Sequence, residues 1–168
     1  MLRLHLLRHA KSSWGDSTLA DAERPLAPRG RKAAKRVARW AAEHDVRPEL
    51  VVCSSAVRAR QTLQRVLPGL GRPEISTEDR LYGASTELLL ARVQALPDEV
   101  EEAMLIGHNP GMQSLVLLLA EPGELRDRAA TKVPTGALAT LEADVSGWAE
   151  VKAGQMRLAS YVVPRDLK

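Results

Sequence analysis

Hydrophobic residues along the chain gather into short apolar runs separated by longer stretches with helical periodicity. Four runs predict buried strands, at residues 2–7, 50–53, 74–77 and 103–107. Between and after them, the spacing of apolar residues predicts helices over residues 31–44, 86–96 and 110–120, and another that ends near residue 67. Ser54 and Ser55 are expected to cap the helix that ends near residue 67, and Thr86 is expected to cap the helix over 86–96. Strands and helices that alternate in this way indicate an α/β protein with helices on both faces of a sheet.

The last part of the chain follows a different pattern. Residues 133–144 and 148–163 predict two strands joined by a turn near residues 144–147, and such a pair is expected to be antiparallel. The predicted fold is therefore a three-layer α/β/α structure with a mostly parallel central sheet and an antiparallel C-terminal strand pair. Neither an internal repeat nor a linker divides the sequence, so a single domain over residues 1–168 is expected.

Composition and charge exclude several classes of function. The formal net charge is +3, and acidic and basic residues are interspersed, so no basic tract or aromatic-rich stretch indicates nucleic-acid binding. The single cysteine, Cys53, cannot form an intramolecular disulfide and is expected to be a buried structural thiol. The first residues lack the apolar segment of a signal peptide, and the apolar run at 115–120 is too short to cross a membrane. A cytoplasmic protein without membrane association is expected.

Candidate chemistry lies at the ends of three predicted strands. Arg8 and His9 follow the first strand, Arg58 lies one helical turn beyond the second, and His108 follows the fourth. Ligands of open α/β sheets bind beyond the carboxyl ends of the strands, so these four side chains are expected to converge. Arginines match the geometry of phosphate oxygens, and the helix expected after Asn109 begins with free N–H groups. For Arg8 and His9 alone, a functional and a structural role are about equally expected, but the combination of all three strand ends predicts an anion site.

These motifs give the chain its resemblance to a known family. The sequence resembles the histidine phosphatase (phosphoglycerate mutase-like) superfamily, and in particular its SixA-like phosphohistidine phosphatases. The matching segments, in family order, are R-H-A-K-S-S-W at 8–14, L-A-P-R-G at 26–30, S-S-A-V-R-A-R-Q-T at 54–62, R-L-Y-G-A at 80–84 and G-H-N-P-G at 107–111. The resemblance implies a phosphatase with the phosphoglycerate mutase-like fold.

The resemblance also implies roles for the matching residues. His9 would be the nucleophile that accepts the phosphoryl group, and Arg8, Arg58 and His108 would bind phosphate and stabilise the transferring group. No metal and no cofactor are implied, because the arginines supply positive charge. The partners would be a protein bearing phosphohistidine or a small phosphorylated substrate, with inorganic phosphate as the product.

Two departures from the family pattern bear on the substrate. Gly15 stands where phosphoglycerate mutases have a phosphate-binding asparagine, and no segment matches the glutamate that serves as general acid for alcohol phosphates. The nearby carboxylates that could replace that acid are Glu78, Asp79 and Glu87, with Asp16 and Asp21 as weaker candidates. An imidazole can leave already protonated, so a site without a strong acid suits phosphohistidine better than a phosphomonoester. A broad phosphomonoesterase and a non-catalytic phosphate-recognition module are the alternatives.

Overall fold

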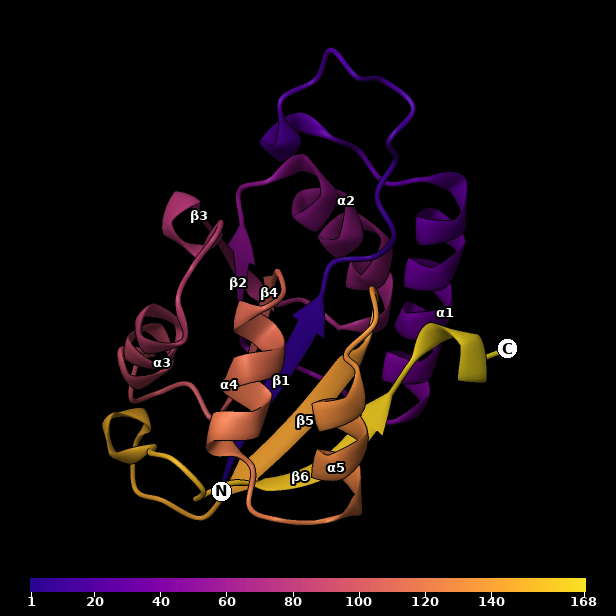
Figure 1. Cartoon of the computed structure of the whole chain (residues 1–168). Coiled ribbons are helices and arrows are strands. Elements are labelled where there is room, and N and C mark those ends of the chain that lie inside the picture. The colour runs from indigo at the N-terminus through magenta and orange to yellow at the C-terminus, as the bar shows by residue number, and fades with distance from the viewer.

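The structure is a computed structural model that describes residues 1–168. Its centre is one six-stranded sheet with the strand order β3-β2-β4-β1-β5-β6 (Figure 1). The strands are β1 (Leu2–Arg8), β2 (Leu50–Ser54), β3 (Glu74–Glu78), β4 (Glu102–Gly107), β5 (Leu138–Ala143) and β6 (Arg157–Val162). Strands β1 to β4 pair in parallel, whereas β5 pairs antiparallel with both β1 and β6. The predicted mostly parallel sheet with an antiparallel C-terminal pair is confirmed.

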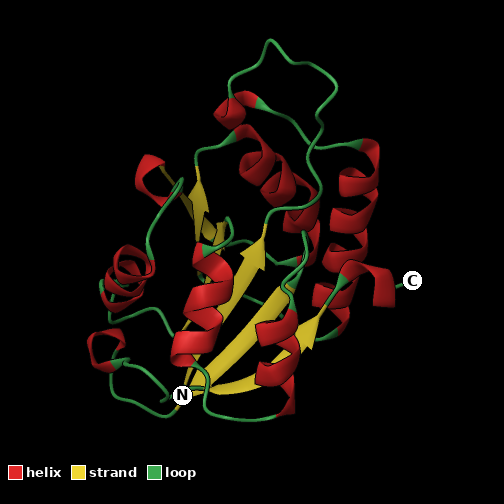
Figure 2. Cartoon of the chain, viewed as in Figure 1, coloured by secondary structure: helices red, strands yellow, loops and turns green.

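Helices cover both faces of the sheet (Figure 2). They are α1 (Pro28–Glu43), α2 (Val57–Val66), α3 (Thr86–Gln94), α4 (Gly111–Leu119) and α5 (Glu124–Thr131). Successive strand residues point to opposite faces, so Leu6 packs in the cluster under α3, α4 and α5, while Leu7 packs in the cluster under α1 and α2. Each central strand is therefore buried on both sides, which explains its nearly continuous apolar sequence.

Several predicted boundaries differ from the structure. Helix α1 begins at Pro28 and not at residue 31, because proline suits the first turn of a helix. Helix α5 was not predicted, since only Ala129 of its residues is buried and its apolar stripe is weak. The two C-terminal strands are shorter than predicted, and part of the excess forms a turn that buries Trp148, whose indole N–H donates to the Val100 carbonyl at 2.6 Å.

Two predicted helix caps are also wrong. The cap of α3 is Ser85, one residue before the predicted Thr86, and its hydroxyl accepts from the Leu88 N–H at 3.1 Å. Helix α2 begins at Val57 without a side-chain cap, so Ser54 and Ser55 lie too early to cap it. These shifts do not move the strand ends on which the candidate site depends. No helix in the structure is long and apolar enough to cross a lipid bilayer.

Candidate active site

The ends of β1, β2 and β4 lie side by side, because β4 is paired in parallel between the other two strands. His9 follows β1 and its backbone N–H donates to the Gly107 carbonyl at the end of β4, at 3.0 Å. The next residue of that strand end, His108, faces His9 with 5.1 Å between ring centroids. Arg58 reaches the same place from α2, with its Nε 3.4 Å from His9 Nε2. The structure thus brings together the imidazoles and the arginine that the sequence places far apart.

The imidazole of His9 is oriented by two hydrogen bonds, one to each ring nitrogen, and is uncharged at neutral pH. The Ala10 carbonyl lies 2.7 Å from His9 Nδ1, so Nδ1 carries the hydrogen and donates, which leaves the lone pair on Nε2. Burial lowers the pKa of His9 to about 3 and outweighs the hydrogen bond to Ala10, which acts in the opposite direction. His108, Arg58 and Arg8 lower that pKa further. His9 therefore presents a neutral nitrogen, and its lone pair accepts a hydrogen bond from Arg58 Nε at 3.4 Å.

The backbone around His9 is held from two sides. The Gly136 N–H, just before β5, donates to the carbonyls of both Arg8 and His9 at 3.0 Å. On the other side, the Ala10 N–H donates to Thr62 Oγ1 at 3.0 Å, and the Thr62 hydroxyl donates to the Arg58 carbonyl at 2.7 Å. Thr62 was missed as a site residue, although it closes the second arginine motif at residues 54–62. This threonine links the segment that carries His9 to the helix that carries Arg58.

The guanidinium of Arg8 has one nitrogen that is hydrogen-bonded within the protein and another that has no partner. Its Nη1 donates to the Val133 carbonyl at 2.9 Å, whereas its buried Nε has no hydrogen-bond partner in the protein. Burial and the nearby positive charge of Arg58 both lower the pKa of Arg8. A buried guanidinium nitrogen without a partner costs free energy, and an anion beside Arg8 and Arg58 would offset the repulsion between their like charges.

His108 receives support from β2 and from the segment before α3. Its Nε2 lies 2.7 Å from the Ser54 hydroxyl, and the Tyr82 ring meets the imidazole edge to face with centroids 5.4 Å apart. Burial, followed by the charges of Arg58 and Arg8, lowers the pKa of His108 to about 4, although Asp21 opposes the effect. The buried Nδ1 of His108 has no partner. Ser54, which the sequence indicated only as a helix cap, instead contacts this histidine.

Asp21 is the carboxylate that the structure brings to the site. Arg58 donates to it twice, from Nη1 to the Asp21 carbonyl at 2.6 Å and from Nη2 to Oδ2 at 2.9 Å. The Tyr82 hydroxyl also donates to Oδ2, and Arg24 donates to Oδ1 at 2.8 Å. These bonds, the one from Tyr82 first, hold the pKa of Asp21 far below its usual range despite the opposing effect of desolvation. Asp21 is therefore ionised at neutral pH and orients Arg58.

The other candidate acids lie elsewhere. Glu78, at the end of β3, forms an ion pair with Arg92 at 2.8 Å, and this pair is the main reason why its pKa is lowered to about 2. Asp79 lies in the turn that follows β3, and Glu87 lies in the first turn of α3. Asp16 accepts hydrogen bonds from Thr18 within its exposed loop. None of these four carboxylates forms a hydrogen bond or ion pair with His9, Arg58 or His108.

Comparison with known proteins supports the family suggested by the motifs. The model of the histidine phosphatase superfamily (branch 1) matches residues 4–103. The Mycobacterium tuberculosis protein Rv1276c is 36% identical over 95% of this chain and 100% of its own length. Phosphohistidine phosphatase SixA of Escherichia coli is 32% identical over 87% of this chain and 88% of its own.

Solved structures show the same similarity. The SixA protein of Agrobacterium tumefaciens superposes with a TM-score of 0.82 at 32% identity, covering 97% of this chain and 98% of that chain. The protein histidine phosphatase SixA, solved with tungstate, superposes with a TM-score of 0.80 at 27% identity, covering 98% of this chain and 99% of that chain.

Proposed function

This chain belongs to the histidine phosphatase superfamily (branch 1) and is a phosphatase of the SixA-like type, and on that premise we propose that it hydrolyses phosphohistidine in proteins through a covalent intermediate on His9. The observation that carries the proposal is the state of His9, whose Nδ1 is bonded to the Ala10 carbonyl and whose neutral Nε2 faces Arg58. A relative solved with tungstate, a tetrahedral oxyanion, supports a phosphate-like ligand for this fold.

In the first step, the Nε2 lone pair of His9 forms a bond to phosphorus while the P–N bond of the substrate breaks. The departing imidazole leaves neutral when its other nitrogen already carries a proton, so the enzyme need not supply one. His9 keeps its Nδ1 hydrogen, bonded to the Ala10 carbonyl, and becomes a phosphohistidine. In the second step, water attacks phosphorus while the bond between phosphorus and His9 Nε2 breaks, and His9 leaves as a neutral imidazole. The proton lost by the water passes to a phosphate oxygen or to solvent, so no proton donor is needed for the leaving group.

Charge on the transferring phosphoryl group is stabilised by the arginines and by His108. Arg58 Nε faces His9 Nε2, and its terminal nitrogens are fixed by Asp21, so this donor is oriented before the substrate arrives. Arg8 and His108 are the further residues that this proposal assigns to phosphate binding, and each has a ring or guanidinium nitrogen without a partner in the protein. This arrangement supplies the electrostatic stabilisation that phosphoryl transfer requires from a protein.

The ionisation of Asp21 favours phosphohistidine over alcohol phosphates. A general acid must be protonated at the working pH, and the pKa of Asp21 lies far below its usual range. A second candidate function, a broad phosphomonoesterase, would need a proton donor in the site. The group that favours it is the Tyr82 hydroxyl, which is bonded to Asp21, although that bond raises the pKa of Tyr82 and makes it a weak acid.

The leaving-group dependence of kcat/KM tests the proposal. We expect a phosphohistidine peptide and p-nitrophenyl phosphate to react, and glycerol phosphate to react more slowly by on the order of 10²-fold, the lower end of what a general acid contributes. His9→Ala should abolish turnover and the denaturation-stable phosphoenzyme, whereas His44→Ala, in an exposed position, should change neither. A flat dependence, with alkyl-phosphate activity lost in Tyr82→Phe, would favour the phosphomonoesterase. Retained activity in His9→Ala would overturn the mechanism.

Two further expectations from the sequence stay predictions. Activity should be insensitive to chelator, because Arg8 and Arg58 supply the positive charge at the site. We also expect a cytoplasmic location, where the enzyme would meet phosphohistidine proteins of that compartment. Cell fractionation tests this location.

A further inference from the structure

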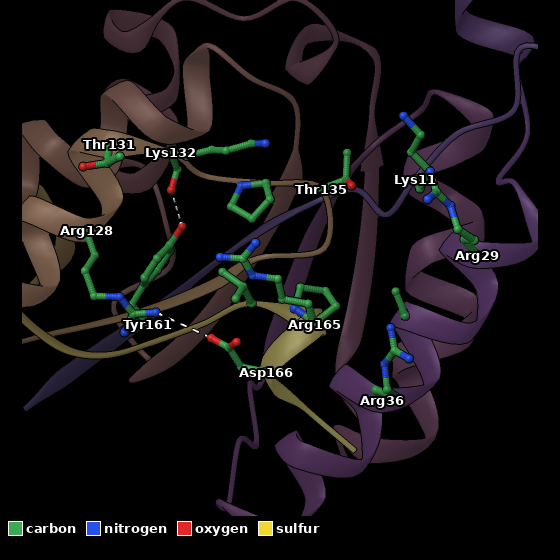
Figure 3. Close-up of a pocket in the computed structure, with 14 residues that line it drawn as sticks. Lys11, Arg29, Arg36, Arg128, Thr131, Lys132, Thr135, Tyr161, Arg165 and Asp166 are labelled. Carbon is green, nitrogen blue, oxygen red and sulfur yellow. Dashed lines mark hydrogen bonds and ion pairs between the residues drawn. The ribbon is translucent and has the colours of Figure 1, made fainter.

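A cavity of about 520 Å³ lies between α1 and α5, beside the C-terminal end of β6 (Figure 3). Basic side chains from both helices and from the C-terminal segment point toward it, and Tyr161 of β6 lies in its wall. We call this cavity the basic groove. Its six basic residues are Lys11, Arg29, Arg36, Arg128, Lys132 and Arg165.

The cations of the basic groove are largely uncompensated. Asp166 is the one carboxylate in its lining, and it pairs with Arg128 at 3.8 Å. The other five basic side chains form no ion pair and donate no hydrogen bond, and the buried Nε of Arg36 has no partner. Six cations and one carboxylate thus face a single cavity in a chain whose net charge is only +3. Like charges gathered in this way repel one another and attract an anion.

The basic groove adjoins the backbone segments that hold the candidate active site. Lys11 lies two residues after His9, and Lys132 precedes Val133, whose carbonyl accepts from Arg8 Nη1 at 2.9 Å. The Tyr161 hydroxyl donates to the Lys132 carbonyl at 2.7 Å, which fixes this wall of the groove. Strand β6 also runs parallel to β1, since both are antiparallel to β5, so the two strands end at the same edge of the sheet. The groove and His9 therefore lie at the same edge of the sheet.

We propose that the basic groove binds an acidic segment of the phosphoprotein substrate that flanks the phosphorylated side chain. This inference rests on the proposed function and adds a preference for substrates with acidic residues next to the phosphohistidine. Sites for compact small molecules are mostly apolar, whereas 3 of the 14 residues that line this groove are hydrophobic. The cations come from three separate parts of the chain, around residues 11–36, 128–132 and 165, which suits carboxylates spread along a polypeptide. Complementary charge of this kind speeds association and selects partners.

Two peptides with the same phosphohistidine core test the proposal, one flanked by glutamates and the other by glutamines. We expect the wild-type protein to prefer the glutamate peptide about ten-fold in kcat/KM at low salt, mainly through KM. The preference should shrink at high salt, because ions screen exposed charges. Turnover of p-nitrophenyl phosphate, which has no flanking segment, serves as the basal activity.

The variant Arg29→Glu/Arg165→Glu should abolish or reverse the preference while leaving the basal activity unchanged. Both residues are exposed and make no ion pair, so the fold should tolerate the change. The matched control is Lys35→Glu/Arg72→Glu, which changes the charge equally at exposed positions outside the groove and should keep the preference.

The outcomes separate this inference from the proposed function. Equal kcat/KM for the two peptides in the wild-type protein, or an equal loss of preference in the control variant, would overturn the basic groove as a docking site. Inhibition by inorganic pyrophosphate that is relieved in the groove variant, without any peptide preference, would assign the groove to a small polyanion instead. Failure of the wild-type protein to hydrolyse either phosphohistidine peptide would overturn the proposed function itself.

Discussion

At the scale of single residues, the site depends on which nitrogen of each group is already engaged. His9 Nδ1 is bonded to the Ala10 carbonyl, which leaves the lone pair on Nε2, where the proposed function places the attack on phosphorus. The terminal nitrogens of Arg58 are bonded to Asp21, which leaves Nε directed at His9. Neighbouring groups therefore decide the roles of these side chains, and small changes in donor geometry are expected to have large effects.

Arg58→Lys tests this dependence on geometry. A lysine keeps the charge, but its single nitrogen cannot pair with Asp21 and face His9 at the same time. We expect kcat/KM to fall roughly ten-fold or more, the equivalent of one charge-assisted hydrogen bond of about 1.5–3 kcal/mol. The control is Arg60→Lys on the same helix, whose exposed side chain bonds only the Ser55 carbonyl. Unchanged kinetics in Arg58→Lys would remove Arg58 from the site.

The lowered pKa values of His9 and His108 predict how stability depends on pH. Both histidines stay neutral in the folded protein until the pH approaches about 3 and 4, whereas in the unfolded chain they take up protons near pH 6.5. The unfolded state therefore binds more protons below pH 6.5, and the free energy of unfolding should fall as the pH decreases from 6.5 to 4.5. Each histidine contributes at most about 1.4 kcal/mol per pH unit.

Denaturant unfolding at several pH values measures this slope. The double variant His9→Asn/His108→Asn should have a flatter slope between pH 6.5 and 4.5, because neither replacement titrates. His44→Asn, in an exposed position, should keep the wild-type slope. Identical slopes in all three proteins would show that the two histidines are not held neutral by the fold.

At the scale of elements, the first turn of α1 positions the segment that follows His9. The Ala27 N–H, just before the helix, donates to the Lys11 carbonyl at 2.9 Å. Gly30 lies in that turn and is buried, and a Cβ atom on it would come within 2.1 Å of the same carbonyl oxygen. The contact joins the backbone of the helix to the backbone at Lys11. An added Cβ could therefore be accommodated only by moving α1 or the segment that follows His9. The glycine of the L-A-P-R-G motif is thus explained by close packing.

Gly30→Ala should therefore destabilise the protein and reduce its activity together. We expect a loss of about 1–3 kcal/mol in the free energy of unfolding, the usual effect of overpacking, measured from urea unfolding curves. A fall in kcat should accompany it, because Lys11 lies two residues from His9. Gly123→Ala is the control, since an added Cβ there meets nothing within 4 Å and its φ of 167° is extended. Wild-type stability in Gly30→Ala would contradict the packing argument.

At the scale of the whole molecule, one sheet connects residues from both ends of the chain. Strand β4 pairs with β2 on one edge and with β1 on the other, and β5 pairs with the remaining edge of β1 (Figure 1). The order of the strands in the sheet therefore differs from their order in the sequence. The two hydrophobic clusters share these strands from opposite faces. Neither half of the chain can form the sheet alone, which favours a single cooperative unit.

We accordingly expect a single unfolding transition for the chain. Far-UV circular dichroism and tryptophan fluorescence should have coincident midpoints, and the calorimetric enthalpy should equal the van't Hoff enthalpy. Two separated transitions would instead indicate that residues 1–168 form more than one folding unit.

The sequence by itself determined the strands, most helices and the four residues whose chemistry suits phosphate. Apolar runs identify buried strands because burial on both faces excludes polar residues, and the motifs after Leu7, Cys53 and Gly107 are local features of the chain. Convergence of the strand ends followed from the general rule for parallel sheets. Sequence alone therefore sufficed for the fold class, and it predicted that Arg8, His9, Arg58 and His108 lie close together.

The tertiary structure was needed for the properties that depend on contacts between residues far apart in the sequence. Asp21 lies in the candidate site because Arg58 and Tyr82 donate hydrogen bonds to it. Glu78 lies outside the site, where it is bound by Arg92. The basic groove joins cations from α1, α5 and the C-terminal segment, which no sequence window contains together. Hydrogen-bond partners and pKa values depend on distances between residues remote in sequence, and only the folded chain sets those distances.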